Sequence, residues 1–186
     1  MKWEVLSMAK KSAGLLLFRE ASGRLEVLLV HPGGPFWAKK DEGAWSIPKG
    51  EFEDNEDPLS AAKREFAEET GLTLDGDVIP LEPLRQPSGK VIYAWAMKHD
   101  VDLTGLKSNT FSMEWPPRSG HYQEFPEIDR AAWFTIETAS EKLLKGQTPL
   151  LSQLQRRVGG PCQLREKRDT TPAKSEPEIQ GTLFNG

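Results

Sequence analysis

Residues 50–72, GEFEDNEDPLSAAKREFAEETGL, define a helix with marked ends and an unusual excess of carboxylates. Asp57 and Pro58 are typical of a helix start, because an Asp side chain accepts hydrogen bonds from first-turn N–H groups and Pro fits the first helical position. Gly71 is typical of a helix end, since glycine adopts the left-handed conformation without strain. The segment therefore predicts a short helix between these signals. Its packing face should hold the apolar residues Leu59, Ala62, Phe66 and Ala67.

The carboxylates of Glu65, Glu68 and Glu69 are spaced i, i+3 and i+4, so all three should project from one side of the helix. Each like-charge pair costs roughly 0.2–0.5 kcal/mol on an isolated helix, and the helix C-terminus also disfavours negative charge. A solvated Glu-rich surface is the plain alternative. The surrounding residues favour a bound divalent cation instead, because Gly50 lets backbone approach a ligand closely and Arg64 can hold carboxylates through its planar fork.

The rest of the chain alternates short apolar runs with turn residues, which predicts mostly strands and an α/β or α+β class. We expect a hairpin, further strands, an irregular connector at Ser108–Glu127 and two terminal helices. The expected strands are Ser12–Phe18, Leu25–His31, Trp45–Ile47, Asp77–Leu84, Lys90–Met97 and Ala132–Thr135, and the helices are Ile136–Lys145 and Pro149–Val158. From Gly159 the chain becomes polar, so we predict one domain over residues 1–158 and a disordered tail over 159–186.

Charge and cysteine content narrow the function classes. A net charge of −4 gives the chain no general attraction for nucleic acid or an anionic membrane. The single cysteine, Cys162, permits no internal disulfide and fits a reducing compartment. The first residues lack the long apolar region of a signal peptide, and no apolar run approaches the ~18 residues of a membrane helix. We expect a cytoplasmic protein with a small-molecule partner, and the oligomeric state stays open.

The acidic segment resembles the signature of the Nudix hydrolases: Gly, five residues, Glu, seven residues, then Arg-Glu-apolar-any-Glu-Glu-any-Gly-apolar. Every fixed position is matched, by Gly50, Glu56, Arg64, Glu65, Phe66, Glu68, Glu69, Gly71 and Leu72. The resemblance implies an α-β-α sandwich with a mixed central sheet over roughly Ser12–Val158. The signature would form a loop, helix and loop across that sheet.

The same resemblance implies an enzyme that uses Mg²⁺ or Mn²⁺ to hydrolyse a nucleoside diphosphate linked to another group. By similarity, Glu68 and Glu69 are the principal metal ligands, Glu65 is a ligand or orients water, and the carbonyl of Lys49 or Gly50 completes the shell. Divalent ions would offset the charge of a pyrophosphate and activate water.

Two residue roles stay open: the role of Arg64 and the identity of one further catalytic Glu. We expect Arg64 to pair with Glu56 or Glu65 and position them, with direct catalysis as the alternative. Family members often use one more Glu from outside the signature. Glu127 in PEIDRAAWF suits that role, with Glu124 as its competitor.

The segment WSIPKGE resembles the Nudix branch that cleaves dinucleoside polyphosphates, such as diadenosine tetraphosphate, and diphosphoinositol polyphosphates. KVIYAWAM is similar to a strand of that branch. Lys49 would then lie close to the phosphate chain. Pro87, fifteen residues past Leu72, matches a spacing associated instead with the ADP-ribose branch.

Aromatic and basic residues outside the signature are candidates for holding the nucleotide. Phe36 and Trp37, beside Lys39 and Lys40, could stack a base and hold phosphates, or could plug the loop over the sheet. Another group lies further along the chain: Tyr122, His121 and Arg118. Trp95 and Trp133 lie in strand patterns and are expected in the core.

Other functions compete with dinucleoside polyphosphate hydrolysis. Clearance of ordinary or oxidised nucleoside triphosphates uses the same chemistry. A Nudix module that binds a nucleotide without cutting it has no need of the full carboxylate set. A prenyl diphosphate isomerase is a distant alternative, because its family relies on a Cys, and Cys162 falls in the predicted tail.

Overall fold

The computed structural model describes residues 10–159, so Cys162 and the predicted tail from residue 160 onward lie outside the described residues. The elements in chain order are β1 Lys11–Ala21, β2 Arg24–Pro32, β3 Lys49–Glu51, α1 Pro58–Thr70, β4 Ile79–Pro80, β5 Leu84–Arg85, β6 Val91–Lys98, β7 Thr110–Glu114, β8 Tyr122–Pro126, β9 Ile128–Thr135, α2 Ile136–Lys142, a 3₁₀ turn Lys145–Gln147 and α3 Pro149–Val158. Within residues 10–159, no helix combines the length and the apolar character needed to cross a membrane.

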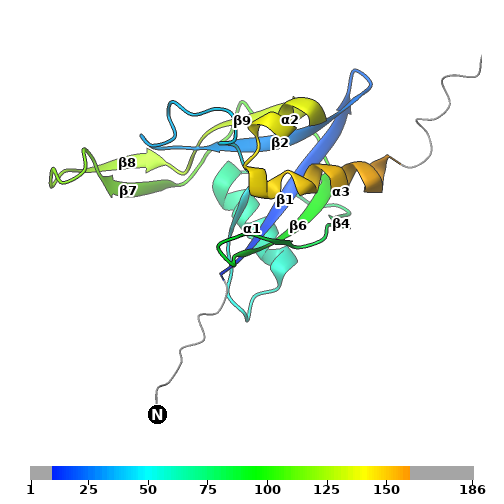
Figure 1. Cartoon of the computed structure of the whole chain (residues 1–186), viewed down its shortest axis with the longest axis horizontal. Coiled ribbons are helices and arrows are strands. Elements are labelled where there is room, and N and C mark those ends of the chain that lie inside the picture. Colours follow the sequence, from blue (N-terminus) through cyan, green and yellow to red (C-terminus); the bar gives the residue numbers. More distant parts are fainter. Residues whose placement is uncertain (1–9, 160–186) are drawn as a thin grey trace, which may run out of the picture.

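A mixed seven-stranded sheet forms the centre of the fold (Figure 1). Its main path runs β4-β6-β1-β2-β9, with β3 paired to β1 and β5 paired to β6. The β1–β6 pair is parallel, whereas the other pairs of this sheet are antiparallel. β1 is therefore the strand on which the parallel pair, the β1–β2 hairpin and the short β3 converge.

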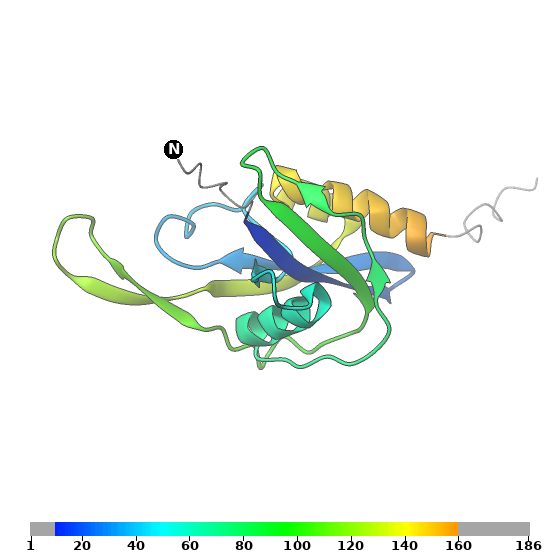
Figure 2. The ribbon, with the colours of Figure 1, turned by 90° about the horizontal axis from the view of Figure 1, so that it is seen from below.

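Helices cover both faces of this sheet, with α1 on one side and α2 and α3 on the other (Figure 2). Successive β1 side chains point to opposite faces. Leu16 packs with the α3 residues Leu150 and Leu154, while Leu15 and Leu17 pack with α1. Burial on both faces explains why β1 is apolar throughout its middle rather than alternating. The expected α-β-α sandwich with a mixed sheet is confirmed.

Several predicted elements are present with adjusted ends. The predicted β1–β2 hairpin turns at Ser22 and Gly23, both of which have positive φ. The predicted helix Pro149–Val158 is confirmed as α3. The first terminal helix is shorter than predicted, since α2 ends at Lys142.

Two strand predictions were too generous. Trp45–Ile47 is not a strand: Trp45 and Ser46 make only isolated bridges, to Leu143 and Val30 respectively. Asp77–Leu84 is not continuous, because β4 and β5 are two-residue strands separated by Leu81–Pro83. Pro80 and Pro83 have no N–H to donate, which limits a longer ladder.

The prediction that Ser108–Glu127 is irregular is wrong. β7 and β8 form an antiparallel hairpin, here called the arm (Thr110–Pro126), which extends away from the central sheet (Figure 1). Phe111 faces Phe125 across the arm, with ring centroids 6.1 Å apart. The loop after β2 covers the same aromatic region: a Cβ on Gly34 would lie 3.1 Å from the Phe111 ring. The strands are short and the turn between them is rich in Pro and Gly, a pattern that is also typical of an irregular loop.

Candidate active site

The ends of α1 are set by the residues that the sequence indicated. The Asp57 carboxylate accepts a hydrogen bond of 2.9 Å from the backbone N–H of Ser60, and Gly71 ends the helix with φ 75°. Burial of Phe66 against the sheet stabilises the helix by about 1.5–3 kcal/mol. The fully buried positions are Ala61, Ala62, Phe66 and Thr70. Leu59 and Ala67, predicted in the packing face, are only partly buried.

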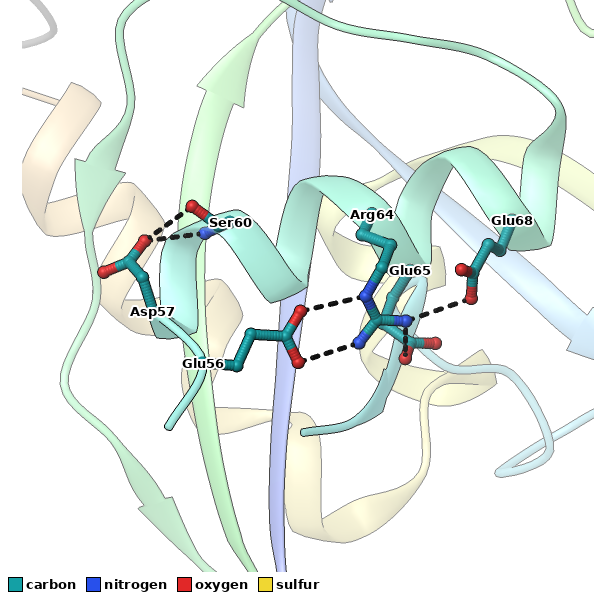
Figure 3. Close-up of polar contacts among 6 residues, drawn as sticks. All are labelled: Glu56, Asp57, Ser60, Arg64, Glu65 and Glu68. Atoms are coloured by element: carbon teal, nitrogen blue, oxygen red, sulfur yellow. Dashed lines mark hydrogen bonds and ion pairs between the residues drawn. The ribbon is translucent and has the colours of Figure 1, made fainter. Parts of the chain in front are cut away.

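Arg64 connects three carboxylates on the outer side of α1 (Figure 3). Its Nε and Nη2 donate to the two oxygens of Glu56 at 2.9 and 3.1 Å, so this pair is bidentate. Its Nη1 donates to Glu65 at 2.7 Å and to Glu68 at 3.1 Å. Hydrogen bonding to Arg64 lowers the pKa of Glu56. Arg64 was expected to pair with Glu56 or Glu65, and it contacts both.

The carboxylate of Glu65 lies directly over the backbone of Gly50. A Cβ built on Gly50 would collide with both Glu65 oxygens, so only glycine allows this approach. The Glu65 side chain is 14% exposed, against 45% for Glu68. Burial raises the pKa of Glu65, and repulsion from Glu68 and Glu127 adds to it, while Arg64 opposes the increase.

Glu69 is held against β3 from the last turn of α1. Its Oε2 accepts a hydrogen bond of 2.9 Å from the backbone N–H of Lys49. Burial raises the pKa of Glu69 to about 8, repulsion from Glu65 and Glu127 contributes, and Lys49 opposes the shift. Burial also disfavours the charged form of the Lys49 amine and so lowers its pKa, whereas the charge of Glu69 acts to raise it. α1 and β3 thus hold two partly desolvated carboxylates beside a lysine.

Glu127 and Glu124 lie in different surroundings. Glu127 follows the last residue of the arm, and its charge raises the pKa of both Glu65 and Glu69, which places it near these two carboxylates. Glu124 lies in β8, opposite Ser112, and is exposed, as Glu127 is. This arrangement favours Glu127 as the carboxylate that joins the signature residues.

The candidate nucleotide contacts divide into packed and exposed side chains. Trp37 is half-buried and packs against the core, and Lys40 Nζ lies 4.6 Å from its ring centroid. This packing favours a plug over base stacking for Trp37. Phe36 is 57% exposed and stands edge-to-face with Trp115 of the arm turn, 5.4 Å between centroids. Tyr122 is 72% exposed on the arm, and Lys39 is exposed beside Trp37. Trp95 and Trp133 pack against the α1-side core, as expected.

The donor set at this site fits a hard divalent cation. Carboxylate oxygens and nearby backbone carbonyls are the ligands that Mg²⁺ and Mn²⁺ prefer. Burial, with a smaller contribution from neighbouring carboxylates, raises the pKa values of Glu65 and Glu69, and a bound cation would offset both effects. Among residues 10–159, no three acidic, His or Cys side chains already converge into a metal cage. Arg64 already holds one oxygen each of Glu65 and Glu68, so a shared ion requires these side chains to turn.

Substituting Gly50 by Ala is expected to lower kcat by about 10–100-fold, because the new methyl group displaces the Glu65 carboxylate and small misplacements of a catalytic group are costly. Gly105→Ala is the matched control, since a Cβ there meets nothing within 4 Å. Steady-state kinetics on both variants make the comparison. Equal activity in the two would contradict a requirement for close approach at Gly50.

The chain belongs to the Nudix family: the NUDIX domain model matches residues 8–154. It is a Nudix hydrolase by this match and by its hydrolase relatives. Nudix hydrolases generally use divalent metal ions.

Among characterised relatives, an RNA pyrophosphohydrolase from Bartonella henselae is 25% identical over 148 residues, covering 69% of this chain and 78% of the relative. A bis(5'-nucleosyl)-tetraphosphatase (asymmetrical) from Caenorhabditis elegans is 36% identical over 66 residues, covering 36% of this chain and 44% of that protein. This chain therefore matches less than half of the tetraphosphatase, although identity there is higher.

Solved structures support the fold. The NUDIX domain of Shewanella oneidensis NrtR, complexed with ADP ribose, matches with TM-score 0.57 at 16% identity, covering 85% of this chain and 94% of that one. A C. elegans Ap4A hydrolase in a binary complex matches with TM-score 0.53 at 23% identity, covering 82% and 99%. Both structures have the same overall fold as this chain.

Proposed function

We propose that this chain is a divalent-metal-dependent pyrophosphohydrolase of dinucleoside polyphosphates, with diadenosine tetraphosphate as the representative substrate. The main support is the group of carboxylates near Gly50. Glu65 and Glu69 are partly desolvated there, and they repel one another and Glu127. Such a site is unfavourable by itself and favourable when it faces cations and a phosphate chain. The likeness of WSIPKGE to the dinucleoside polyphosphate branch and the identity to the C. elegans tetraphosphatase support this substrate class.

Each residue has a stated task in this proposal. Glu68 and Glu69 hold Mg²⁺ or Mn²⁺, with Glu65 and the carbonyl of Lys49 or Gly50 beside them, and Arg64 orients Glu65 and Glu68. The bound ion supplies charge neutralisation and water activation when present. Lys49 places its amine beside Glu69, where it can meet the phosphates, and Glu127 adds a carboxylate whose charge acts on both Glu65 and Glu69.

The nucleotide contacts in this proposal are Phe36, Tyr122 and Lys39. The exposed Phe36 ring, steadied by Trp115, offers a surface on which a base can stack. Trp37 anchors the loop after β2 to the core, and Lys40 Nζ lies over its ring. Lys39 is exposed beside these aromatics and can attract phosphate oxygens.

Phe36→Ala is expected to raise KM for a dinucleoside tetraphosphate by about 10-fold with little change in kcat, because base stacking is worth about 1–3 kcal/mol. Pyrophosphate-containing compounds without a base should show no such change. Initial-rate kinetics with both kinds of substrate make the test. An unchanged KM would remove Phe36 from the binding surface.

A substrate panel with Mg²⁺ and product masses tests the function itself. A dinucleoside polyphosphate should leave a nucleotide on each side of the cleaved bond, whereas a nucleoside triphosphate would give a monophosphate and pyrophosphate. Preference for triphosphates or ADP-ribose would replace the proposed substrate within the same chemistry. Tight nucleotide binding with no product under saturating metal would favour the non-catalytic module instead.

A second candidate substrate is the 5' triphosphate end of RNA. It is favoured by the B. henselae RNA pyrophosphohydrolase, whose match spans 78% of that relative. Both candidates present a phosphate chain joined to a nucleoside, so the same carboxylates would serve either. Competition between a 5'-triphosphorylated oligonucleotide and diadenosine tetraphosphate ranks the two by kcat/KM.

A further inference from the structure

His31, at the end of β2, is fully buried and makes polar contacts with two distant segments. Its Nδ1 lies 2.7 Å from Asp129 Oδ1, and its Nε2 lies 2.8 Å from the backbone carbonyl oxygen of Lys40 and 3.0 Å from Arg130 Nη2. Asp129 belongs to β9, and Lys40 lies in the segment that connects β2 to β3. A buried polar group is costly unless it is hydrogen-bonded, so these contacts fix all three segments together.

The first of these segments carries Glu127. Asp129 follows Glu127 by two positions. The carbonyl of Glu127 accepts a 2.9 Å hydrogen bond from the N–H of Gly33, and its own N–H donates to Asn109 O at 2.8 Å. A Cβ on Gly33 would collide with Pro126 O, so β2 and the base of the arm meet without room for a side chain. His31 and Gly33 therefore hold the Glu127 turn from the same strand end.

The second segment leads to Gly50. Lys40 precedes Asp41, whose carboxylate accepts from Trp45 Nε1 at 2.8 Å. The Trp45 ring lies edge-to-face on His31, with centroids 5.2 Å apart. Ser46 then pairs with Val30 through backbone hydrogen bonds of 2.9 Å in both directions. One imidazole thus contacts both the turn that carries Glu127 and the chain that enters β3.

We propose that His31 is a positioning residue that sets the Glu127 carboxylate relative to the signature glutamates, chiefly through Asp129. The inference rests on the proposed function for its kinetic consequences, since it requires Glu127 to act in catalysis. No sequence pattern indicates this role, because His31 and Asp129 are 98 residues apart.

The kinetic test compares His31→Phe with Leu154→Ala, a core variant in α3 on the opposite side of the sheet from α1. His31→Phe should lower kcat about 10–100-fold with KM changed less than about threefold, at a temperature where both variants are folded. Leu154→Ala should keep kcat within about threefold. Equal loss of kcat in both variants would make His31 an ordinary stability residue and overturn the proposal.

Two amide substitutions separate the contacts of the ring. Asn places its amide near the position of Nδ1 and preserves the contact with Asp129, whereas Gln reaches toward the position of Nε2, where Lys40 O and Arg130 Nη2 lie. His31→Asn should therefore retain at least about fivefold more kcat than His31→Gln. The reverse order, or equality, would overturn the assignment to Asp129. These variants also serve if His31→Phe fails to fold.

A double-mutant cycle with Glu127→Gln tests whether His31 acts through Glu127. In that background, His31→Phe should lower kcat less than about twofold, because the interaction it supports is already lost. Fully additive effects would contradict the proposal.

Hydrogen exchange keeps this inference distinct from the proposed function. The exchange measurement needs no substrate. His31→Phe should therefore speed exchange at the Gly33 and Glu127 amides by about 10-fold or more, even if no hydrolysis is found. Unchanged exchange at both amides would overturn the structural part of the inference. Absence of activity in the unaltered protein would instead overturn the proposed function.

Discussion

Replacing Glu69 by Gln is expected to lower kcat by about 10³-fold and to leave the fold as stable as before, or more stable. A metal ligand contributes several kcal/mol to charge stabilisation in the transition state, and each 1.4 kcal/mol is about tenfold in rate. The Gln carbonyl can still accept the hydrogen bond that Lys49 N–H now donates to Glu69. The substitution removes a buried charge that repels Glu65 and Glu127.

The stability half of this prediction has a defined pH window. The pKa of Glu69 is raised by burial from 4.5 to about 8, so the folded state favours the protonated form. Its contribution to stability is complete below pH 4.5 and is lost as pH rises to about 8. In a metal chelator, the melting temperature of Glu69→Gln relative to the unaltered protein should therefore rise across this window. Retained kcat, or a lower melting temperature at pH 8, would contradict the role given to Glu69.

The second large effect is expected at the base of the arm. Glu127→Gln should lower kcat by about 10²-fold, whereas Glu124→Gln should change it less than about twofold. The two residues are three positions apart, but only Glu127 repels both Glu65 and Glu69. Glu124 is exposed on β8 and is the matched control.

Kinetics at saturating substrate and metal separate the two carboxylates. If Glu124→Gln were the inactive variant, the competitor weighed from the sequence would take the role. If neither variant lost activity, neither Glu127 nor Glu124 would have a part in the reaction. In that event the His31 inference would lose its kinetic basis.

The elements predicted well from sequence are those whose signals are local. Asp57, Pro58 and Gly71 each act within one turn of α1, so both helix ends were found. The apolar runs of β1 and β2 are long and buried, which made their hairpin plain. The arm was missed because its strands alternate Phe111 and Phe125 with polar Ser112 and Glu124, a pattern too short to distinguish from a loop.

The site was predictable as far as the signature reaches. The pairing of Arg64 with Glu56 was expected from residues close in sequence. Gly50 was expected to approach a ligand, and its approach to Glu65 depends on how β3 meets α1. The contacts between His31, Asp129 and Lys40 do not, because only the fold brings β2 and β9 together. Likewise, Trp115 as the partner of Phe36 depends on how the arm meets the loop after β2.

The most direct measurement is anomalous diffraction from crystals grown in abundant Mn²⁺ with a non-hydrolysable dinucleoside tetraphosphate. Our account predicts an anomalous peak bonded to the Glu69 carboxylate and to phosphate oxygens, lost in crystals of Glu69→Gln. Ordered nucleotide with no manganese at Glu65, Glu68 or Glu69 would contradict it.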